Sequence, residues 1–416
     1  MINGVATFAR NLASGLAERG HEVLVLAPSI TGEFSIAEDP EHNFKTARLS
    51  SLSLPIYPDQ IHVVPEDKSL LGLKIPTFWY KNGLRVCYKA YSESVKVLDD
   101  FGPDLIHNQT PGPVALAILR YAKLRQVPLV STDHAYPDNL TQQARLPKII
   151  KRPMNKMMNR YFISFLKKSQ YATMPSEQAV SDLIPKNKKR FKVAVEALSN
   201  GIDLSRFKPG KVDPKIYQKY QLPKKQPIVL YVGRVDPEKS LDVLVTAFAK
   251  LAKLHPEPVL VIVGDGTARA KLEQLAQKLN IDKRCYFLGR VTGADLPQIY
   301  RSAKVFAISS KTETQSIVLM EAMATGKPCV AVKAGAIPAL IASGKNGFLC
   351  KPDDPKALAM AILKIIENEV LANQMSQAAL EKIKPHDLDY TLSRLEDIYQ
   401  NVIERYKIEA PFKRLF

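Results

Sequence analysis

The sequence predicts an α/β protein with two domains, each built around a parallel sheet. Short apolar runs alternate with helix-forming stretches along the whole chain, a pattern typical of parallel strands joined by crossover helices. The length of 416 residues is enough for two domains. Hydrophobic residues make up 46% of the chain and charged residues 24%, which favours a compact globular protein over a disordered one.

Eight apolar runs carry the strand signal, three in the first half of the chain and five in the second. They span residues 21–28, 103–108, 127–134, 228–233, 259–266, 285–290, 304–309 and 327–332. A polar, basic segment over 185–192 separates the two groups, and we place the interdomain linker there. This organisation predicts an N-terminal domain over 1–195, a C-terminal domain over 196–387 and a final segment over 388–416.

The two ends of the chain carry different signals. Near the C-terminus, apolar residues recur at helical spacing from Leu392 to Ile403, which predicts one long helix. At the N-terminus a helical stretch opens at Asn3 and Gly4, with only two residues before it. A doubly wound domain normally has a strand before its first helix. Either the start is misassigned or the first domain lacks its first strand.

The net charge restricts the class of partner. The sequence has 59 Lys and Arg against 41 Asp and Glu, a formal net charge of +18 that suits nucleic acid, anionic lipid or a phosphorylated substrate. No apolar run reaches the roughly 20 residues of a membrane-spanning helix, and the start lacks the features of a signal peptide. We expect a cytoplasmic protein. The cysteines have no zinc-like spacing and are expected to be buried apolar residues: Cys87, Cys285, Cys329 and Cys350.

The stretch over 309–332 carries the strongest chemical signal. A short helix is predicted from residue 317, with Ser316 as its N-cap. This helix is apolar apart from Glu321, and a buried carboxylate needs hydrogen-bond donors such as the two hydroxyls of a ribose. Glu313, in the preceding loop, could accept from sugar hydroxyls. Free N–H groups at the helix N-terminus can receive a phosphate, around Gln315, Ser316 and Ile317.

These residues resemble a known family. Two glutamates separated by seven residues, ahead of the sequence EAMATGKP, are similar to the donor-site signature of retaining GT-B glycosyltransferases of family four. The resemblance extends over nearly the whole chain. It implies a GT-B fold, with two Rossmann-like domains facing a cleft, and it implies that Glu313 binds the donor sugar and Glu321 the ribose. A nucleotide-diphosphate sugar would be the substrate, with no metal and no other cofactor.

Two cations follow the strand over 228–233. Arg234 and Lys239 lie in a loop at the end of a parallel strand, where ligands commonly bind, and together they can neutralise a diphosphate. The family has Arg and Lys at matching positions, but usually Gly where this chain has Ser240, which could instead cap the next helix. The resemblance adds further donor-binding candidates: Gly4, Gly233, Gly264, Arg290, Val291 and Thr314.

One histidine in the first half joins the catalytic candidates Arg234, Lys239 and Glu313. His134 lies just beyond the predicted strand over 127–134. By itself a lone histidine is more often a structural residue. The resemblance favours a role in the reaction, because a histidine in this context matches one that faces the reacting sugar.

The segment over 147–169 is basic and contains no acidic residue. Met154, Met158, Tyr161, Phe162 and Phe165 recur in it at helical spacing, which predicts an apolar stripe flanked by cations. The segment could lie on an anionic membrane, or it could be an ordinary domain helix with a solvated basic face. Nucleic acid is not expected, because no groove-reading motif accompanies the charge. The candidate contacts with membrane or acceptor are Lys151, Arg152, Lys156 and Arg160.

The function predicted is transfer of a hexose, from UDP-glucose and with retention, to a hydroxyl of a lipid such as diacylglycerol at the inner face of the membrane. The resemblance is nearest to bacterial diacylglycerol glucosyltransferases, followed by phosphatidylinositol mannosyltransferases. A GDP-mannose-dependent enzyme acting on a phosphatidylinositol-type or other acceptor is therefore one alternative. A nucleotide-sugar-binding protein without catalysis is another, because of the missing strand. An NAD-dependent oxidoreductase is disfavoured, since Arg269 stands where the dinucleotide fingerprint needs a third glycine.

Overall fold

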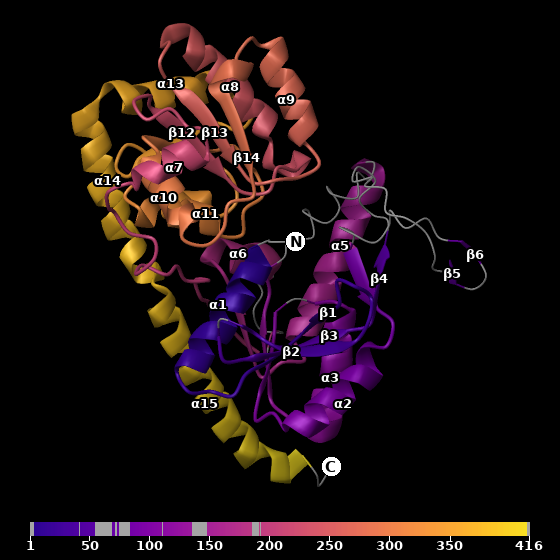
Figure 1. Cartoon of the computed structure of the whole chain (residues 1–416). Coiled ribbons are helices and arrows are strands. Elements are labelled where there is room, and N and C mark those ends of the chain that lie inside the picture. Colours follow the sequence, from indigo (N-terminus) through magenta and orange to yellow (C-terminus); the bar gives the residue numbers. More distant parts are fainter. Residues whose placement is uncertain are drawn as a thin grey trace. The chain divides into compact units, whose positions relative to one another are not determined.

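The chain forms two compact units (Figure 1). Unit 1 comprises Met1–Leu198 and Leu392–Phe416, and unit 2 comprises Ser199–Thr391. Both contain parallel sheets with connecting helices, so the predicted two-domain α/β fold is confirmed. The computed structural model describes residues 4–40, 42–54, 69–70, 73–74, 84–109, 111–134, 148–184, 191 and 193–413.

Unit 2 contains one six-stranded parallel sheet. The strand order is β14-β13-β12-β15-β16-β17, so β12 lies in the centre, between β13 and β15. Because all neighbouring strands are parallel, their carboxyl ends share one edge, and the strand order reverses at β12 and β15. The bounds are β12 (Ile228–Val232), β13 (Val259–Val263), β14 (Cys285–Gly289), β15 (Val305–Ile308), β16 (Cys329–Val332) and β17 (Gly347–Cys350).

Helices cover both faces of this sheet. Figure 1 shows α8, α9 and α13 on one face and α10 and α11 on the other. The short helices α7 and α12 and the longer α14 complete the unit. The bounds are α7 (Pro214–Lys219), α8 (Leu241–Leu254), α9 (Arg269–Lys278), α10 (Asp295–Ser302), α11 (Ile317–Ala324), α12 (Ile337–Leu340), α13 (Pro355–Glu367) and α14 (Glu369–Ile383).

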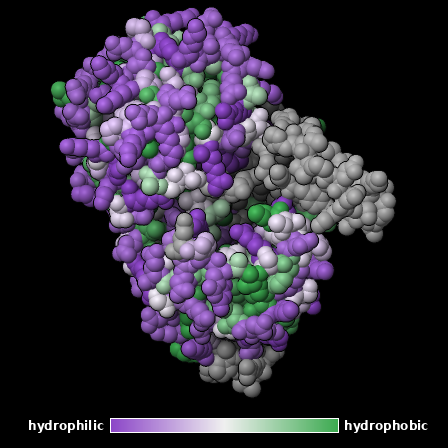
Figure 2. All heavy atoms as spheres, viewed as in Figure 1, coloured by the Kyte–Doolittle hydropathy of each residue, from purple (hydrophilic) through white to green (hydrophobic). Residues whose placement is uncertain are grey.

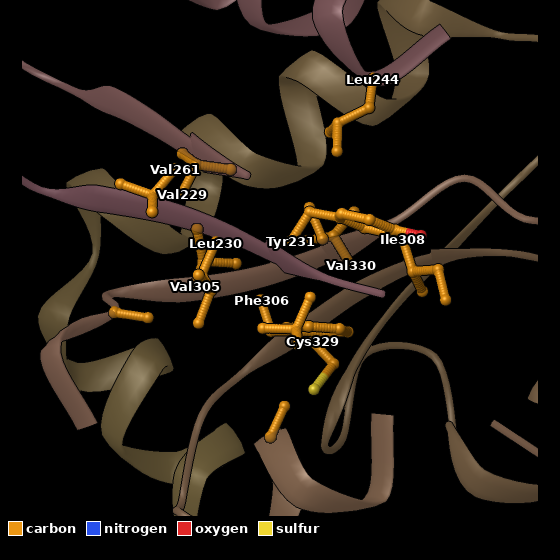
Figure 3. Close-up of a cluster of buried hydrophobic side chains, with 14 of the residues drawn as sticks. Val229, Leu230, Tyr231, Leu244, Val261, Val305, Phe306, Ile308, Cys329 and Val330 are labelled. Carbon is orange, nitrogen blue, oxygen red and sulfur yellow. The ribbon is translucent and has the colours of Figure 1, made fainter. Parts of the chain in front are cut away.

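The core of unit 2 is built on the central strands. Figure 3 shows side chains from the neighbouring strands β12, β15 and β16 packed together, with Leu244 of α8 pointing toward them. Val229, Phe306 and Leu244 have no exposed surface. Strands buried on both faces read as continuous apolar runs, which is why the sequence predicted them. The sheet therefore gives the loops at its carboxyl edge a rigid support.

A single arginine secures the connection from α8 to β13. Arg284 lies at the end of the short 3-10 helix Asp282–Arg284, and its guanidinium lies 5.5 Å from the centre of the Phe248 ring. It donates hydrogen bonds to three backbone carbonyls, that of Ala252 in the last turn of α8 at 3.2 Å and those of His255 at 3.0 Å and Pro258 at 2.7 Å in the connection to β13. Backbone acceptors at the end of a helix need such partners.

The strands of unit 1 form two principal sheets. One has the order β1-β3-β2 and the other the parallel order β11-β10-β9-β8. Two small pairs, β4 with β7 and β5 with β6, accompany them. The bounds are β1 (Leu24–Pro28), β2 (Ser35–Glu38), β3 (Lys45–Leu49), β4 (Ser51–Leu54), β5 (Ser69–Leu70), β6 (Leu73–Lys74), β7 (Leu84–Cys87), β8 (Ile106–Asn108), β9 (Leu129–Thr132), β10 (Tyr171–Met174) and β11 (Ala194–Ala197).

In the described part of unit 1, no strand pairs with the outer edges of β1 and β8. In unit 2 the central strand β12 joins β13 to β15, whereas no described strand of unit 1 joins β1 to β8. Every residue of β1 and β8 is only half-buried, while all of β9 is buried. Figure 2 shows hydrophobic residues gathered on the unit 1 face near β2 and β3. The residues before Gly4, where the sequence suggested a missing strand, lie outside the described residues.

The last helix belongs to unit 1 from Leu392 onward. Helix α15 (Leu388–Lys413) is the long helix that the sequence predicted. Its Leu392 contacts α1 so closely that a Cβ on Gly15 would lie 2.4 Å from a Leu392 methyl group. Arg394 makes a two-pronged ion pair with Glu196, at 3.0 and 2.8 Å. The other helices of unit 1 are α1 (Gly4–Glu18), α2 (Ala90–Phe101), α3 (Pro113–Arg125), α5 (Lys148–Leu166) and α6 (Glu177–Leu183).

The division between the units falls later in the chain than the basic segment 185–192. Strand β11 follows that segment but pairs with β10 in unit 1, so the chain enters unit 2 only after Leu198. Residues 185–190 and 192 of the predicted linker lie outside the described residues. The boundary differs from the predicted 195/196 because an apolar strand after a polar segment gives no sign of which sheet it joins.

Burial of the cysteines agrees with the prediction at three of the four positions. Cys87, Cys329 and Cys350 are buried as predicted, whereas Cys285, on the edge strand β14, is only half-buried. Desolvation raises the pKa of the Cys285 thiol to about 12.

Among the residues that the structure describes, no helix combines the length and apolar character needed to span a bilayer.

Candidate functional site

The loop after β12 places both predicted phosphate-binding cations at the carboxyl edge of the unit 2 sheet. Gly233 follows the strand with a φ of 150°, and the chain then passes through Arg234 to the 3-10 helix Pro237–Lys239. The Tyr231 hydroxyl donates to the carbonyl of Arg234 at 2.9 Å, which fixes the start of the loop. Both cations thus follow a strand whose five residues are all buried.

Each cation already has a carboxylate partner. The Arg234 guanidinium donates to Asp236 Oδ2 at 2.6 Å and also to Glu238. The ammonium of Lys239 donates to Glu313 Oε1 at 2.7 Å. These pairs are largely buried, since the side chains of Lys239 and Glu313 are 15% and 11% exposed. The structure thus brings Lys239 and Glu313, which are 74 residues apart in the chain, into direct contact.

Serine and glycine residues hold the Glu313 loop beside the Lys239 loop. Ser309, just after β15, donates from its hydroxyl to the carbonyl of Ser240 at 2.8 Å. The Ala336 N–H donates to the carbonyl of Glu313 at 2.9 Å. A Cβ on Gly335, which has a φ of 53°, would lie 2.6 Å from that same carbonyl oxygen. Glu313 is therefore fixed through its backbone as well as its carboxylate.

Gly264 and Gly266 let the loop after β13 lie directly against the loop after β12. A Cβ on Gly264 would lie 1.8 Å from the carbonyl oxygen of Gly233, and one on Gly266 would lie 2.4 Å from that of Val235. The Gly264 N–H also donates to the carbonyl of Gly289 at 2.7 Å. These glycines therefore support the Arg234 loop through close backbone packing.

Glu321 is buried in α11 with one strong partner. The Tyr300 hydroxyl, from α10, donates to Glu321 Oε2 at 2.6 Å. Desolvation raises the pKa of Glu321 to about 7, while the hydrogen bond from Tyr300 and the charge of Arg206 act in the opposite direction. The predicted buried helix with a single acid is confirmed, because residues 319–324 of α11 are all buried.

Two serines that were predicted as helix caps do not cap. Ser316 precedes α11 with a φ of 76°, and Ser240 precedes α8 with a φ of 51°, and neither side chain makes a capping hydrogen bond. The prediction was wrong because a capping serine normally has an extended backbone, which directs its hydroxyl toward the second or third helical N–H. Both serines instead have the left-handed conformation that favours glycine.

The remaining donor-site candidates fall into different places in the loops. The amide side chain of Gln315 is engaged inside unit 2, where Oε1 accepts from the Asn200 N–H at 2.9 Å and Nε2 donates to the Ser199 hydroxyl at 2.8 Å. Only the backbone of Gln315 therefore remains as a possible contact for a bound donor. Thr314 and Ile317 are half-buried beside it, and after β14 Val291 is buried while Arg290 is exposed.

His134 and Gly4 belong to unit 1. The His134 ring follows β9, lies 4.9 Å from the Phe8 ring of α1, and has its Nε2 3.0 Å from Gln109 Oε1. Since an amide oxygen only accepts, Nε2 carries the proton in this contact. Desolvation lowers the pKa of His134 to about 3, so the ring is neutral at physiological pH. Gly4 is the first residue of α1.

The structure corrects the predicted apolar stripe of α5. Phe162 and Phe165 are buried and Met158 packs against a core cluster, so most of that stripe faces the interior of unit 1. A different set of apolar side chains is exposed, including Ile149 at 84% and Met157 at 59%. The exposed side chains interleaved with them are Arg152, Lys156, Arg160 and Tyr161, while Lys151 is half-buried.

The sequence missed several residues that shape the candidate site. Tyr300 holds Glu321, and Asp236 and Glu238 pair with Arg234. The two acids lie two and four residues after the arginine, and this proximity could have identified them. Tyr300 had no such signal, because it reaches Glu321 from another helix.

Family models match both halves of the chain. The model described as Glycosyltransferase Family 4 matches residues 2–206, and the model described as Glycosyl transferases group 1 matches residues 212–382. Arg234, Lys239, Glu313 and Glu321 all fall inside the second match.

Curated relatives are glycosyltransferases with different acceptors. Alpha-monoglucosyldiacylglycerol synthase of Acholeplasma laidlawii is 26% identical, over 97% of this chain and 95% of its own. Sulfoquinovosyl transferase SQD2 of Arabidopsis thaliana is 31% identical, over 69% of this chain and 54% of its own. D-inositol 3-phosphate glycosyltransferase of Salinispora tropica is 30% identical, over 51% of this chain and 47% of its own. The chain thus spans about half the length of the last two.

Solved structures share the fold along the whole chain. Sucrose-phosphate synthase from Thermosynechococcus elongatus has a TM-score of 0.73 and 22% identity, covering 97% of this chain and 94% of its own. Anabaena HepE, solved in complex with UDP and glucose, has a TM-score of 0.69 and 20% identity, covering 96% of each chain. These similarities support the two-domain GT-B fold.

The close packing of Gly264 on Gly233 predicts a large effect of one methyl group. Gly264→Ala should destabilise unit 2 by more than about 3 kcal/mol, because the new Cβ meets a backbone oxygen that cannot move without displacing the Arg234 loop. Gly344→Ala is the matched control. Gly344 has a φ of 84° but no atom within 4 Å of a Cβ, so only the backbone cost of about 1–2 kcal/mol applies. Urea unfolding measures both, and equal losses would contradict the packing argument.

The raised pKa of Glu321 predicts a pH-dependent stability. A carboxyl whose pKa is about 7 in the folded chain and near the model value of 4.5 in the unfolded chain stabilises the fold fully below pH 4.5. That contribution is lost as pH rises through 7. The free energy of unfolding of the parent, relative to Glu321→Gln, should therefore fall by on the order of 3 kcal/mol between pH 4.5 and 8. A difference that stays constant over this range would show that Glu321 is not desolvated.

Proposed function

The chain belongs to family 4 of the GT-B glycosyltransferases, and from this premise we propose that it transfers a hexose from a nucleotide diphosphate to a hydroxyl of a lipid. The observation that carries the proposal is the convergence of Arg234, Lys239 and Glu313 at the carboxyl edge of the unit 2 sheet. The name of the Acholeplasma relative supports diacylglycerol as the acceptor. The Anabaena complex with UDP and glucose supports UDP-glucose as the donor.

The two cations would stabilise the departing diphosphate. In the reaction the bond between the anomeric carbon and the phosphate oxygen breaks, and the diphosphate leaves with the electron pair. The acceptor oxygen forms its bond on the same face of the sugar, and its proton leaves with the diphosphate. Arg234 and Lys239 would exchange their carboxylate partners for phosphate oxygens, which places positive charge where negative charge develops. We propose that this reaction needs no metal.

The two glutamates would bind the two ends of the donor. When a phosphate replaces Glu313 as the partner of Lys239, the Glu313 carboxylate becomes available to accept hydrogen bonds from sugar hydroxyls. Tyr300 engages Oε2 of Glu321, and Oε1 is therefore the atom proposed to accept from the ribose hydroxyls. Glu321 would bind the ribose best when ionised, because a carboxylate accepts stronger hydrogen bonds than its protonated form.

His134 would contribute a neutral hydrogen bond from unit 1. Its low pKa keeps the imidazole uncharged across the physiological range, so it can orient a sugar hydroxyl without placing a cation near the reacting carbon. His134→Ala should accordingly slow turnover without removing a step from the pH profile near 6.5.

A second candidate function rests on a specific relative. The Salinispora protein, 30% identical, is named as a glycosyltransferase of D-inositol 3-phosphate. This similarity favours an inositol-containing acceptor, for which GDP-mannose is the donor we would test first. A protein that binds nucleotide sugar without turnover is the remaining alternative. It is supported by the edges of β1 and β8, with which no strand among the described residues of unit 1 pairs.

The exposed face of α5 supports a peripheral membrane location at an anionic leaflet, such as the inner face of the plasma membrane. Apolar side chains that can enter the headgroup region, Ile149 and Met157, alternate there with exposed cations. The helix has no acidic residue. Such a face gains from both apolar burial and attraction to anionic lipid. The protein would then encounter its lipid acceptor in the membrane leaflet to which it binds.

Transfer activity tests the proposed reaction. We expect the full chain to transfer glucose from UDP-glucose to diacylglycerol in vesicles, and to do so in the presence of EDTA. Glu313→Ala should lower kcat roughly 10- to 150-fold, the cost of about 1.5–3 kcal/mol for losing a hydrogen bond to a charged group. Radiolabelled sugar in the lipid fraction measures the transfer.

The same assay separates the alternatives. Transfer from GDP-mannose to phosphatidylinositol alone would favour the second candidate. Nucleotide binding without transfer to any lipid would favour the alternative of a binding protein without catalysis. A strict requirement for a divalent cation would contradict the two-cation mechanism.

Vesicle binding tests the membrane face. Neutralising Arg152, Lys156 and Arg160 to Gln should release the protein from vesicles rich in phosphatidylserine, because each surface cation contributes about 1 kcal/mol. Parent binding should also fall as salt rises. Co-sedimentation measures both effects.

The matched control removes the same charge from unit 2. Lys271, Lys278 and Lys283 are exposed in and after α9, and their replacement by Gln lowers the net charge equally. Equal release by the two triple variants would mean that net charge, and not the α5 face, drives binding.

A further inference from the structure

Two pairs of polar side chains connect the neighbouring strands β8 and β9 of unit 1. The first pair joins His107 to Thr132, with Nε2 2.7 Å from Oγ1. The second pair lies two residues further along each chain and joins His134 to Gln109, with Nε2 3.0 Å from Oε1. Side chains two residues apart along a strand lie on the same face of the sheet. The two pairs therefore follow one another along one face, at the carboxyl ends of these strands.

The first pair is held from both sides. His107 Nδ1 lies 2.5 Å from the hydroxyl of Tyr399 on α15, and the Thr132 hydroxyl lies 2.5 Å from that of Thr173 on β10. Desolvation, and to a smaller extent the charge of His134, lowers the pKa of His107 to about 3. The ring is therefore neutral, and this row of hydrogen bonds fixes the ends of β8 and β9 on which the second pair depends.

The second pair determines which nitrogen of His134 carries the proton. The amide oxygen of Gln109 only accepts, so Nε2 is protonated and Nδ1 of the neutral ring is an acceptor. Nδ1 has no hydrogen-bond partner among the described residues of the chain, although His134 is only 7% exposed. An acceptor in such surroundings is unfavourable unless a bound molecule donates to it.

The surroundings of His134 keep the ring neutral. The titratable groups beside it in unit 1 include His107 of β8 and its chain neighbour Asp133, and α1 contributes the Phe8 ring. Desolvation is the cause that lowers the pKa of His134 to about 3. Nδ1 therefore keeps its lone pair over the physiological range, provided that the proton stays on Nε2.

We propose that Gln109 is a positioning residue, which holds the proton of His134 on Nε2 and leaves Nδ1 to accept a hydrogen bond from a sugar hydroxyl. This inference rests on the proposed function, in which His134 orients such a hydroxyl. In the other tautomer Nδ1 would carry the proton and could only donate, so the hydroxyl would have to turn its own proton elsewhere. Gln109 thus acts through His134.

Gln109→Leu removes the acceptor that fixes the tautomer. Long-range proton–nitrogen spectra of the full chain labelled with ¹⁵N-histidine distinguish the two tautomers, and the signals of His134, one of seven histidines, are identified by their loss in His134→Gln. The parent should show the Nε2–H tautomer and Gln109→Leu a mixture of both. The kcat for sugar transfer should fall about tenfold or more, with nucleotide affinity unchanged, because Arg234 and Lys239 lie in unit 2.

Gln109→Glu is the conservative variant that separates positioning from a structural role. Its carboxylate also accepts from Nε2–H, so it should keep the tautomer and recover most of the lost kcat at about pH 8. An opposite charge beside the imidazole raises its pKa by roughly 1–3. A protonated Nδ1 cannot accept, so the ratio of variant kcat to parent kcat should fall as the pH decreases from about 8 to about 5.

Gln170→Leu is the matched control. Gln170 Oε1 accepts from the N–H of Leu129, the first residue of β9, at 2.6 Å. The substitution therefore removes the same kind of acceptor from the opposite end of the same strand. It should lower Tm, because a hydrogen bond is lost, and leave both the tautomer of His134 and the pH dependence of kcat as in the parent.

The outcomes that overturn the inference differ from those that overturn the proposed function. If Gln109→Leu keeps the Nε2–H tautomer, or if Gln109→Glu has the pH profile of the parent, Gln109 does not position His134, whereas the proposed function stands. Equal losses of kcat in Gln109→Leu and Gln170→Leu would also refute the inference and indicate a loss of stability alone. A parent that transfers no sugar would refute the proposed function, and the spectra would still decide whether Gln109 fixes the tautomer.

Discussion

The central position of β12 in the unit 2 sheet is the constraint on which the candidate site depends. Its two neighbours run parallel to it, and the loops after β12 and β15 therefore leave the sheet side by side. The hydrogen bond from Ser309 to the Ser240 carbonyl joins these loops. Lys239 and Glu313, 74 residues apart in the chain, meet as a result. A change in the order of the strands would separate them.

The cations of the candidate site are paired with carboxylates although the protein as a whole is strongly basic. Arg234 and Lys239 face three carboxylates, those of Asp236, Glu238 and Glu313. A phosphate that binds there would replace carboxylate partners and would not simply be attracted to free cations. Recognition would then depend on geometry. An anion has to replace the hydrogen bonds that Arg234 and Lys239 make with these carboxylates, and only an anion that reaches both cations can replace them all.

Sequence patterns predicted those parts of the fold that repeat. Buried strands and the helix with Glu321 were found because burial leaves continuous apolar runs. The bond from Tyr300 to Glu321 could not be predicted, since it depends on how two helices pack. The conformation of Ser316 was missed because propensity favours serine as a cap, while the loop geometry sets the backbone. The prediction of an exposed apolar stripe on α5 was wrong for another reason. Apolar residues occur on both faces of that helix, and their spacing alone does not show which face is buried.

The contacts of Arg284 give unit 2 a tolerance of ionic strength. Its guanidinium binds neutral carbonyls and an aromatic face in place of a carboxylate, and salt screens such contacts far less than it screens an exposed ion pair. Lysine could not replace it, because a single ammonium cannot reach carbonyls in a planar fork. High salt would therefore weaken the attraction of this basic chain to anionic surfaces and leave the connection between α8 and β13 intact.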